Sequence, residues 1–531
     1  MRHWTIVFIC ILVAGLAADT VWDSNIKVRS SVALDWDRQC APMFDGGILY
    51  IWTDTSDTDR DLKAMRVGAL GNALWTQPRI IDDKTGIQKD PVMVATTDGN
   101  YIVAWIDTHN RLTGDIRVQK IDLNCGIIWE QGGIPVTDTE AREYDLRLTA
   151  DTLNGAILTW TSQSDNDIRS YGQAISWNGT LRWNAGGIDL TQRSYYVITS
   201  QVPDNDNGIM FCYSTDYDSV SGVYLNRYTA NGAPAWAAPD SISDGLTMNR
   251  ARKLCNGGDY FYLSWYHYEG NYSTTYIQKY TQDGTAIWNA PVNTTSSGPN
   301  IDMVDIVYTQ GDDSVVTALV QYTDSNSLIL QKFSSQGIAM WGAGIVVEPT
   351  LPSYFDFSTM SMCPAANGGV YVTWLRQSGE DWYGVPYIQK FTSYGGQVWQ
   401  LGGVPLSAAP GERVFPLMTP VQDELWVAWA AIHSNEHCLH IQKLSATGVP
   451  ALEPNGRVLY GGLNSMYTEG KITLSRSADC IVFWDDDRFG GSYCQVYMQV
   501  INPEGTFDFA QNGVPVTTNT FSSQYLSNPW Y

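Results

Sequence analysis

The amino-acid sequence predicts an all-β fold, a single closed β-propeller of eight to nine four-stranded antiparallel blades, and three observations lead to this prediction. The spacing Gln-x5-Gly-x3-Trp returns about every 53 residues along the 531-residue chain. Each repeat reads as four short strands separated by turn residues. The composition, with 12% aromatic residues and 47 Gly, favours β-structure with many turns.

The repeat motif occurs nine times if degenerate copies are counted. Copies with the full spacing are Gln173/Gly179/Trp183, Gln278/Gly284/Trp288, Gln331/Gly337/Trp341 and Gln389/Gly395/Trp399. In a fifth copy, Gln119/Cys125/Trp129, Cys replaces Gly. The degenerate copies are Met65/Gly71/Trp75, Asn226/Gly232/Trp236, Gln442/Gly448/Leu452 and Gln499/Gly505/Phe509. A regular array of this kind indicates one continuous body instead of several domains.

The second repeat illustrates the strands that we expect. They cover residues 90–97, 101–105, 115–122 and 127–137, with turn residues between them. The second strand is the most apolar one in each repeat, as expected for a strand that is buried on both faces. Radial closure of such units protects the sheet edges that an open row would expose.

The motif residues have structural explanations. Glycine at the tip of the hairpin between the third and fourth strands adopts a positive φ without strain. The tryptophan is a large flat side chain suited to packing on the next blade, and a buried glutamine must be paired, here with backbone. Because the pattern recurs in every repeat, we interpret these residues as scaffold and not as ligand-binding: Trp75, Trp129, Trp183, Trp236, Trp288, Trp341, Trp399, Gln119, Gln278, Gln331 and Gln389.

These repeats resemble the tryptophan-docking propellers of the quinoprotein dehydrogenases and their non-enzymatic relatives, which also carry Gly-x3-Trp. They are more similar to repeats of secreted bacterial surface proteins, in which Gln-Lys and Gly-x3-Trp precede a further Gly-Ile or Gly-Val, as at Gly133-Ile134 and Gly403-Val404. The resemblance covers residues 22–518 and implies a propeller. The dehydrogenases' cofactor-binding signature is not matched, so the resemblance implies neither their cofactor nor their activity.

The N-terminal residues indicate export. Residues 1–18 combine a basic start with a short apolar run and small residues at its end, which is typical of a signal peptide. No later apolar run approaches the roughly 20 residues that cross a bilayer, so we expect no membrane span once the signal is removed. We therefore expect a secreted or cell-surface protein with its propeller at residues 19–518 and a tail at 519–531.

The charge limits the classes of partner. The formal net charge is -23, with 32 Lys and Arg in the whole chain. Binding to nucleic acid needs clustered cations, so the sequence predicts no nucleic-acid partner, and an anionic membrane surface is equally disfavoured.

Two groups of residues could bind metal. Acids follow several second strands and would form a rim for Ca²⁺, although none matches a full calcium-binding loop and solvated turn acids are the simpler explanation. These acids are Asp54, Asp57, Asp59, Asp61, Asp165, Asp167, Asp216, Asp218, Asp485, Asp486 and Asp487. His433, His437 and His440 lie within eight residues and could hold Zn²⁺, but His437 and His440 would face opposite sides of a strand. We expect no cofactor, with calcium as the alternative.

No catalytic signature accompanies the repeats, since neither a Ser/His/Asp motif nor a phosphate-binding loop is present. We therefore expect a non-catalytic module that binds a glycan or an extracellular protein through a loop-bearing face or the central channel. Two alternatives remain open, an extracellular polysaccharide hydrolase or lyase that uses loop acids, and a structural component of a surface layer.

Overall fold

A computed structural model describes most of the repeat region. The described residues are 34–42, 47–55, 60–68, 74–75, 77–165, 167–192, 195–215, 222–242, 248–269, 272–294, 301–322, 326–351, 360–377, 383–408, 411–433, 436–462, 470–474, 479–486, 495–510 and 512–515. The expected signal peptide and the expected tail lie outside these residues. Among the described residues, no helix is long and apolar enough to span a membrane.

The described chain is all-β, apart from one short 3-10 turn at Ala366–Gly368, and its strands follow one another in antiparallel groups of four. We call each group a unit and name it by its strands. The first units consist of β1 (Leu34–Pro42), β2 (Ile48–Thr55), β3 (Asp61–Val67), β4 (Arg79–Asp82); β5 (Gln88–Ala95), β6 (Tyr101–Asp107), β7 (Asp115–Ile121), β8 (Ile134–Pro135); β9 (Arg142–Ala150), β10 (Ala156–Ser164), β11 (Asp167–Ile175) and β12 (Ile188–Asp189).

The middle units follow the same order. They consist of β13 (Tyr196–Pro203), β14 (Ile209–Thr215), β15 (Tyr224–Tyr228), β16 (Asp240–Ser241); β17 (Met248–Asn256), β18 (Tyr260–Glu269), β19 (Tyr272–Thr281), β20 (Val292–Asn293); β21 (Ile301–Thr309), β22 (Ser314–Gln321), β23 (Ser327–Phe333) and β24 (Ile345–Glu348).

The last units comprise β25 (Ser361–Pro364), β26 (Val370–Gln377), β27 (Tyr383–Phe391), β28 (Val404–Pro405); β29 (Gly411–Val421), β30 (Glu424–His433), β31 (Glu436–Leu444), β32 (Arg457–Gly462); β33 (Gly470–Leu474), β34 (Cys480–Asp486), β35 (Gln495–Ile501) and β36 (Val514–Pro515). Two pairs of neighbouring units are joined into eight-stranded sheets, through Arg169 opposite Tyr196 and through Tyr383 opposite Glu412.

The fourth strand is shorter than the sequence predicts. In the β5–β8 unit the expected strand at 127–137 is reduced to a single bridge between Ile121 and Ile127, followed by β8. Gly132 and Gly133, both with positive φ, turn the chain between these two pairings. A Cβ added to Gly133 would lie 2.5 Å from the Trp105 ring. The interruption of the fourth strand therefore leaves room for the tryptophan of the second strand.

The core of each unit lies along its second strand. Every residue of β6 is buried, as expected for a strand covered on both faces. In five units the tryptophan at the fifth or sixth position of the second strand stacks on the ring directly opposite it on the third strand, with ring centroids 5.3–6.1 Å apart. These pairs are Trp160/Tyr171, Trp265/Tyr276, Trp374/Tyr387, Trp429/His440 and Trp484/Tyr497.

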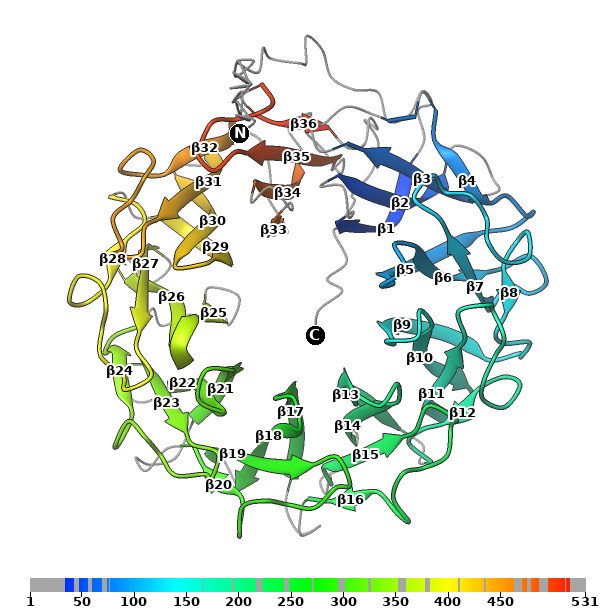
Figure 1. Ribbon diagram of the computed structural model, residues 1–531, viewed down its shortest axis with the longest axis horizontal. Helices are drawn as coiled ribbons and strands as arrows, with labels where there is room; N and C mark the ends of the chain where they lie inside the picture. Colours follow the sequence, from blue (N-terminus) through cyan, green and yellow to red (C-terminus); the bar gives the residue numbers. More distant parts are fainter. Residues whose placement is uncertain are drawn as a thin grey trace, which may run out of the picture.

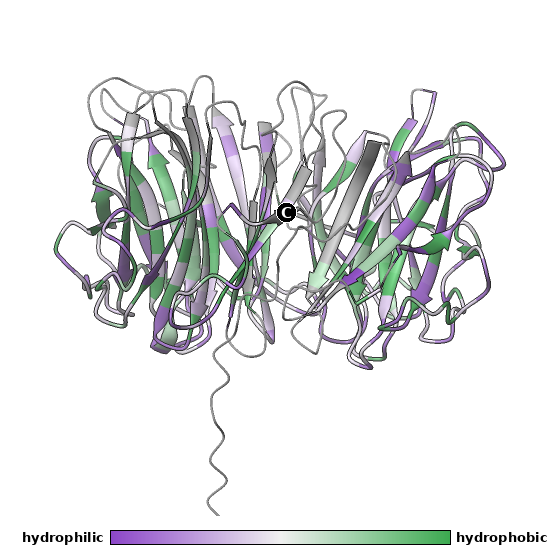
Figure 2. Ribbon diagram, turned by 90° about the horizontal axis from the view of Figure 1, so that it is seen from above, coloured by the Kyte–Doolittle hydropathy of each residue, from purple (hydrophilic) through white to green (hydrophobic). Residues whose placement is uncertain are grey.

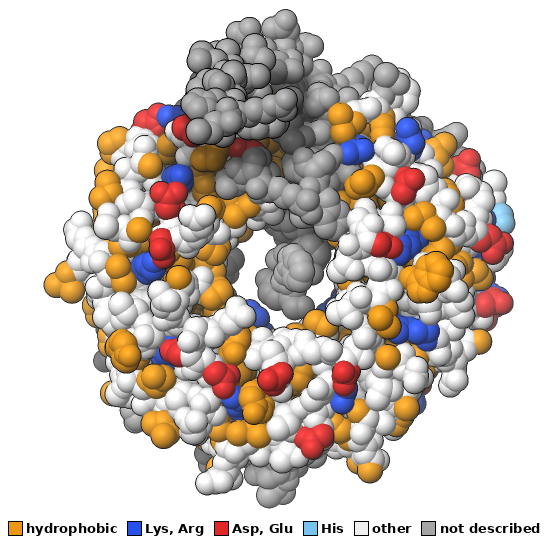
Figure 3. All heavy atoms as spheres, in the orientation of Figure 1, with side chains coloured by type: hydrophobic (Ala, Val, Ile, Leu, Met, Phe, Trp, Pro, Cys, Tyr) orange, Lys and Arg blue, Asp and Glu red, His pale blue; other side chains and the backbone are white. Residues whose placement is uncertain are grey.

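The units are arranged around a central opening, in a β-propeller-like manner, with the first strand of each unit innermost (Figure 1). The strands run across the thickness of the molecule (Figure 2), and the opening is visible on the molecular surface (Figure 3). Buried residues of the first and last units share one core cluster, in which Phe483 and Val500 join Leu49, Tyr50 and Trp75. Many first strands carry a β-bulge, for example at Trp36/Arg38 and Ala251/Lys253.

Candidate functional site

In six units the motif tryptophan connects its unit to the next unit along the chain. Six indole Nε1 atoms donate to a backbone carbonyl of the next unit's hairpin, two residues before its motif glycine. The donor and acceptor residues are Trp129 and Trp177 (3.0 Å), Trp183 and Ala230 (3.0 Å), Trp236 and Gln282 (3.3 Å), Trp288 and Ser335 (3.0 Å), Trp341 and Ser393 (3.1 Å), and Trp399 and Ala446 (3.0 Å). The hairpin backbone of one unit thus lies on the indole of the unit before it.

The burial of the motif tryptophans agrees with this position. Trp75, Trp183, Trp288, Trp341 and Trp399 are buried, whereas Trp129 and Trp236 are partly buried. The first of these, Trp75, lies under the Arg79 guanidinium at 4.6 Å.

The motif glutamine ties the third strand to the chain around the tryptophan of its own unit. In Gln331, Oε1 accepts from the backbone N–H of Lys332 (2.9 Å) and of Trp341 (3.2 Å), while Nε2 donates to the Gly342 carbonyl (2.9 Å). Bonds of the same kind surround the other buried motif glutamines: Gln119, Gln173, Gln278, Gln389, Gln442 and Gln499. The amide replaces backbone pairing where the fourth strand is interrupted.

The residue after the motif glutamine is often a cation that reaches the next unit. Lys332 is fully buried, and its Nζ lies 2.6 Å from Asp312 Oδ2 and donates to the Gly368 carbonyl of the next unit. Lys120 contacts Asp98 and the Asn154 carbonyl, both at 2.8 Å. A buried cation needs such partners, so these lysines hold neighbouring units together.

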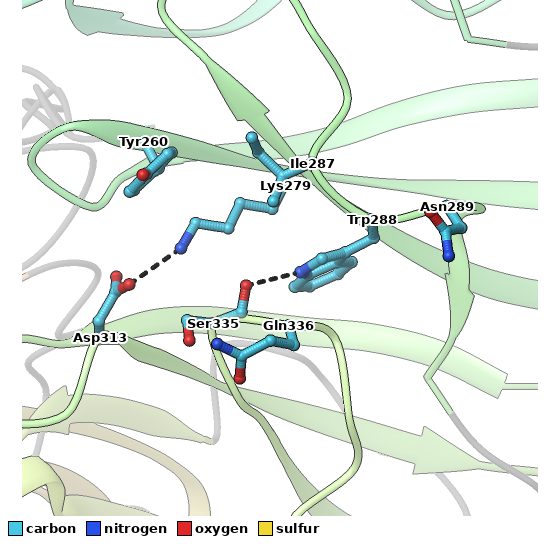
Figure 4. A pocket seen from close by; sticks show the side chains of 8 residues that line it. All are labelled: Tyr260, Lys279, Ile287, Trp288, Asn289, Asp313, Ser335 and Gln336. Atoms are coloured by element: carbon cyan, nitrogen blue, oxygen red, sulfur yellow. Dashed lines mark hydrogen bonds and ion pairs between the residues drawn. The ribbon is translucent and has the colours of Figure 1, made fainter.

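A pocket of about 480 Å³ lies at one of these junctions, between the β17–β20 and β21–β24 units (Figure 4). It is lined by Tyr260, Lys279, Ile287, Trp288, Asn289, Asp313, Ser335 and Gln336. Tyr260 and Asp313 lie beside turns that join first to second strands, and Ser335 and Gln336 belong to the hairpin after β23. The pocket therefore lies at the end of the strands opposite to the loops that follow the second strands.

An ion pair closes the inner side of the pocket. Lys279 is 1% exposed, its Nζ lies 3.0 Å from Asp313 Oδ2 and 3.9 Å from the centre of the Tyr260 ring. The hydroxyls of Tyr262 and Tyr308 both donate to Asp313 Oδ1 at 3.4 Å. Burial, and then the Asp313 charge, raise the pKa of both tyrosines, so they stay neutral donors.

The other lining groups are neutral. Asn289 and Gln336 supply exposed amides, Ser335 supplies a hydroxyl, and Ile287 is 40% exposed. The carboxylate of Asp313, whose side chain is 41% exposed, already contacts a cation and two hydroxyl donors. The pocket can therefore donate hydrogen bonds to a ligand, accept hydrogen bonds from it, and cover an apolar face of a ligand ring.

The acidic loops are only partly described. Lys63 pairs with both Asp54, which is buried, and Asp61 (3.2 Å). Burial lowers the pKa of Lys63, but the two carboxylates raise it more, so this cation already occupies the space between them. Asp167 pairs with Arg169 at 2.9 Å, and Asp165 is exposed on a turn. The residues Asp57, Asp59, Asp216, Asp218 and Asp487 lie outside the described part, as do the side chains of Asp485 and Asp486.

The histidine cluster spans β30 and β31. His433 and His437 lie on these two strands, but their side chains are outside the described part of the structure. His440 is buried and stacks on Trp429 with the ring planes 9° apart. Within the described residues, no three His, Cys, Asp or Glu side chains are grouped so that they could hold a metal ion.

The sequence did not single out the pocket residues other than Trp288. One usable signal was the Gln-Lys dipeptide, which recurs at 119–120, 278–279, 331–332, 389–390 and 442–443. This dipeptide marks a cation at five of the junctions. It does not show which junction contains the pocket, because Tyr260, Asp313 and Gln336 lie far apart in the sequence.

No protein-family model and no curated protein matches the chain. Among solved structures, the chain is similar to prolyl oligopeptidase B from Galerina marginata, with 10% identity, a TM-score of 0.36 and coverage of 75% of this chain and 55% of that one. It is also similar to an ulvan lyase (9% identity, TM-score 0.38, 78% and 92% coverage) and to Drosophila semaphorin 2a (9%, 0.33, 75% and 72%). The chain thus spans about half the length of the prolyl oligopeptidase.

Proposed function

We propose that the units form a closed propeller of nine blades, seven of which carry the motif tryptophan. Two observations support closure, the core cluster shared by the first and last units and the succession of indole-to-carbonyl bonds between consecutive units. A closed ring leaves no unit with an uncovered face, and each unit alone is too small to bury its apolar residues. The expected signal peptide would place this ring outside the cytoplasm, as a secreted or cell-surface protein.

The function that we propose for this propeller is non-catalytic binding of a glycan, through the pocket of Figure 4. The observation that carries the proposal is the chemistry of the lining, in which Lys279 and the partly exposed Asp313 pair with each other and the remaining polar groups are amides and hydroxyls beside aromatic rings. A neutral polyhydroxylated ligand matches this combination, because its hydroxyls pair with amides and its C–H faces lie on aromatic rings. An extracellular protein remains the other class of partner for such a module.

Affinity electrophoresis of the wild-type protein in gels containing xylan, hydroxyethylcellulose, laminarin or mannan tests this function. We expect retardation by at least one polysaccharide, and we expect N289A and Q336A, which remove exposed amides without touching the ion pair, to weaken it. Reducing-sugar release from the same polysaccharide measures turnover. Release of product at an enzymatic rate would refute the binding module in favour of the hydrolase or lyase.

A further inference from the structure

A second exposed feature lies at the junction between the β5–β8 and β9–β12 units. The Trp177 side chain is 63% exposed at the tip of the hairpin that follows β11. Its backbone carbonyl, and not its indole, accepts the Nε1–H of Trp129 at 3.0 Å. Ile128 beside Trp129 is 45% exposed, and Trp129 itself is partly exposed. The exposed parts of Trp177, Ile128 and Trp129 therefore lie at one junction, beside this hydrogen bond.

Five positions of this junction correspond to lining positions of the pocket of Figure 4. Counted from the motif glutamine, Lys120, Ile128 and Trp129 stand where the pocket has Lys279, Ile287 and Trp288. In the next unit, Trp177 and Asn178 stand where the pocket has Ser335 and Gln336. Trp177 and Ser335 also share the same backbone role, since each carbonyl accepts the indole N–H of the preceding unit. The differences are that a broad indole replaces the serine, that Glu130 stands where the pocket has Asn289, and that Gly155 stands where the pocket has Asp313.

The charge at the second junction is also internally neutralised. Lys120 is 2% exposed, and its Nζ contacts Asp98 Oδ2 and the Asn154 carbonyl, both at 2.8 Å. The exposed groups around the Trp177 indole include the Asn178 amide and the Thr180 side chain. A ligand here meets an apolar ring face flanked by these polar groups and by the exposed carboxylate of Glu130.

We propose that Trp177, with Ile128 and Trp129, forms a second sugar-binding subsite, where a pyranose ring stacks on the exposed indole. The proposal takes its ligand class from the proposed function. One indole with an adjacent aliphatic side chain matches the face of one sugar ring, whereas a stable protein partner needs about 800 Å² from each side. Both subsites lie at the same end of the strands, so one polysaccharide chain or particle can engage both and bind more tightly than to either alone.

The test uses W177A, Y260A and the matched control Y394A in the intact protein. Tyr394 is 87% exposed on the corresponding hairpin of the β25–β28 unit but stands at the position of Asn178, one residue after that of Trp177, so Y394A removes an exposed ring from a different position of the hairpin. W177A keeps the carbonyl that accepts the Trp129 hydrogen bond, so the scaffold stays intact. For the polysaccharide that retards the wild type, we expect W177A to raise the dissociation constant about tenfold and Y394A to leave it unchanged.

A second readout follows the indole directly. Adding the hexasaccharide of the retarding polysaccharide should shift the tryptophan fluorescence of the wild type and of Y260A, and the shift should be smaller in W177A. If W177A binds like the wild type while Y260A does not, the pocket function stands and the second subsite is refuted. If W177A loses binding while Y260A keeps it, the subsite stands without the pocket. If no polysaccharide retards the wild type, the glycan assignment is refuted at both places.

Discussion

Replacing Gly232 by alanine tests whether the hairpin glycine is required by its neighbour or only by its backbone angle. Gly232 has φ +78° and lies against the indole of the preceding unit. A Cβ at this position would lie 2.5 Å from Trp183 Cδ1 and 2.7 Å from Ile188 Cδ1. Gly186, in the same part of the molecule, has φ +76° but no atom within 4 Å of such a Cβ. The two glycines therefore differ in packing and hardly at all in backbone conformation.

The expected magnitudes follow from this difference. A left-handed conformation costs an L-residue about 1–2 kcal/mol, which applies to G186A and G232A alike. Only G232A also forces a methyl group into a packed contact, which costs about 1–3 kcal/mol more. Trp183 cannot move freely, because its Nε1 donates to the Ala230 carbonyl at 3.0 Å and its backbone N–H donates to Gln173 Oε1 at 2.8 Å.

Hydrogen exchange measured by mass spectrometry on both variants resolves this difference locally, which suits an array whose units can open separately. We expect G232A to lower protection in peptides covering Trp183 and the hairpin at 229–233, more than G186A lowers it there. A peptide covering β26 serves as the distant control. Equal loss of protection in both variants would refute the inference that the indole contact, rather than φ alone, excludes a side chain.

Three further predictions concern buried polar groups. Q331L removes the acceptor of the Lys332 and Trp341 backbone N–H groups and the donor to the Gly342 carbonyl, so it should lower the free energy of unfolding by about 2 kcal/mol or more. An unchanged thermal unfolding midpoint would contradict this prediction. K332M should lower the free energy of unfolding by about 1–3 kcal/mol, because it leaves Asp312 and the Gly368 carbonyl without their shared cation. Since the cation is buried, urea unfolding should give nearly the same loss at low and at high salt. Burial, and then the Asp107 charge, raise the pKa of Asp82 from 3.8 to about 6. Between these two values the folded protein keeps a proton that the unfolded chain releases. The resulting contribution to stability is full below pH 3.8 and is lost by about pH 6. D82N should lack that fall in unfolding midpoint between pH 4 and pH 6, and a profile identical to that of the wild type would contradict the assignment.

The all-β architecture and the four-stranded antiparallel unit could be predicted from the sequence because both follow from local patterns. Apolar runs such as residues 101–105 mark second strands, and turn residues separate them from their neighbours. The length of the fourth strand could not be predicted this way. The Gly132-Gly133 turn interrupts it to make room for Trp105, and that contact joins residues on different strands.

The candidate site was less accessible to sequence reasoning for a related reason. Its residues come from two units, and Asp313 reaches Lys279 across 34 positions of the chain. The turn acids that the sequence emphasised follow second strands, at the opposite end of the strands from the pocket. Where they are described, Asp54 and Asp61 share a lysine, a partner that no linear motif indicates.

The degenerate repeats show how the junctions tolerate loss of the tryptophan. In the β29–β32 unit the motif position is Leu452, which has no N–H to donate to the next hairpin. The equivalent carbonyl, two residues before Gly505, belongs to Pro503, and there Lys443 Nζ is the donor at 2.9 Å. Arg457 adds a bond to the Gly505 carbonyl and lies over the Phe507 ring at 5.4 Å. This junction therefore has one donor for the hairpin carbonyl, Lys443, and a separate surface against the hairpin glycine, the Leu452 side chain. In the six units with an indole donor the tryptophan supplies both, and the lysine after the motif glutamine can take over the first role because it already points into the same junction.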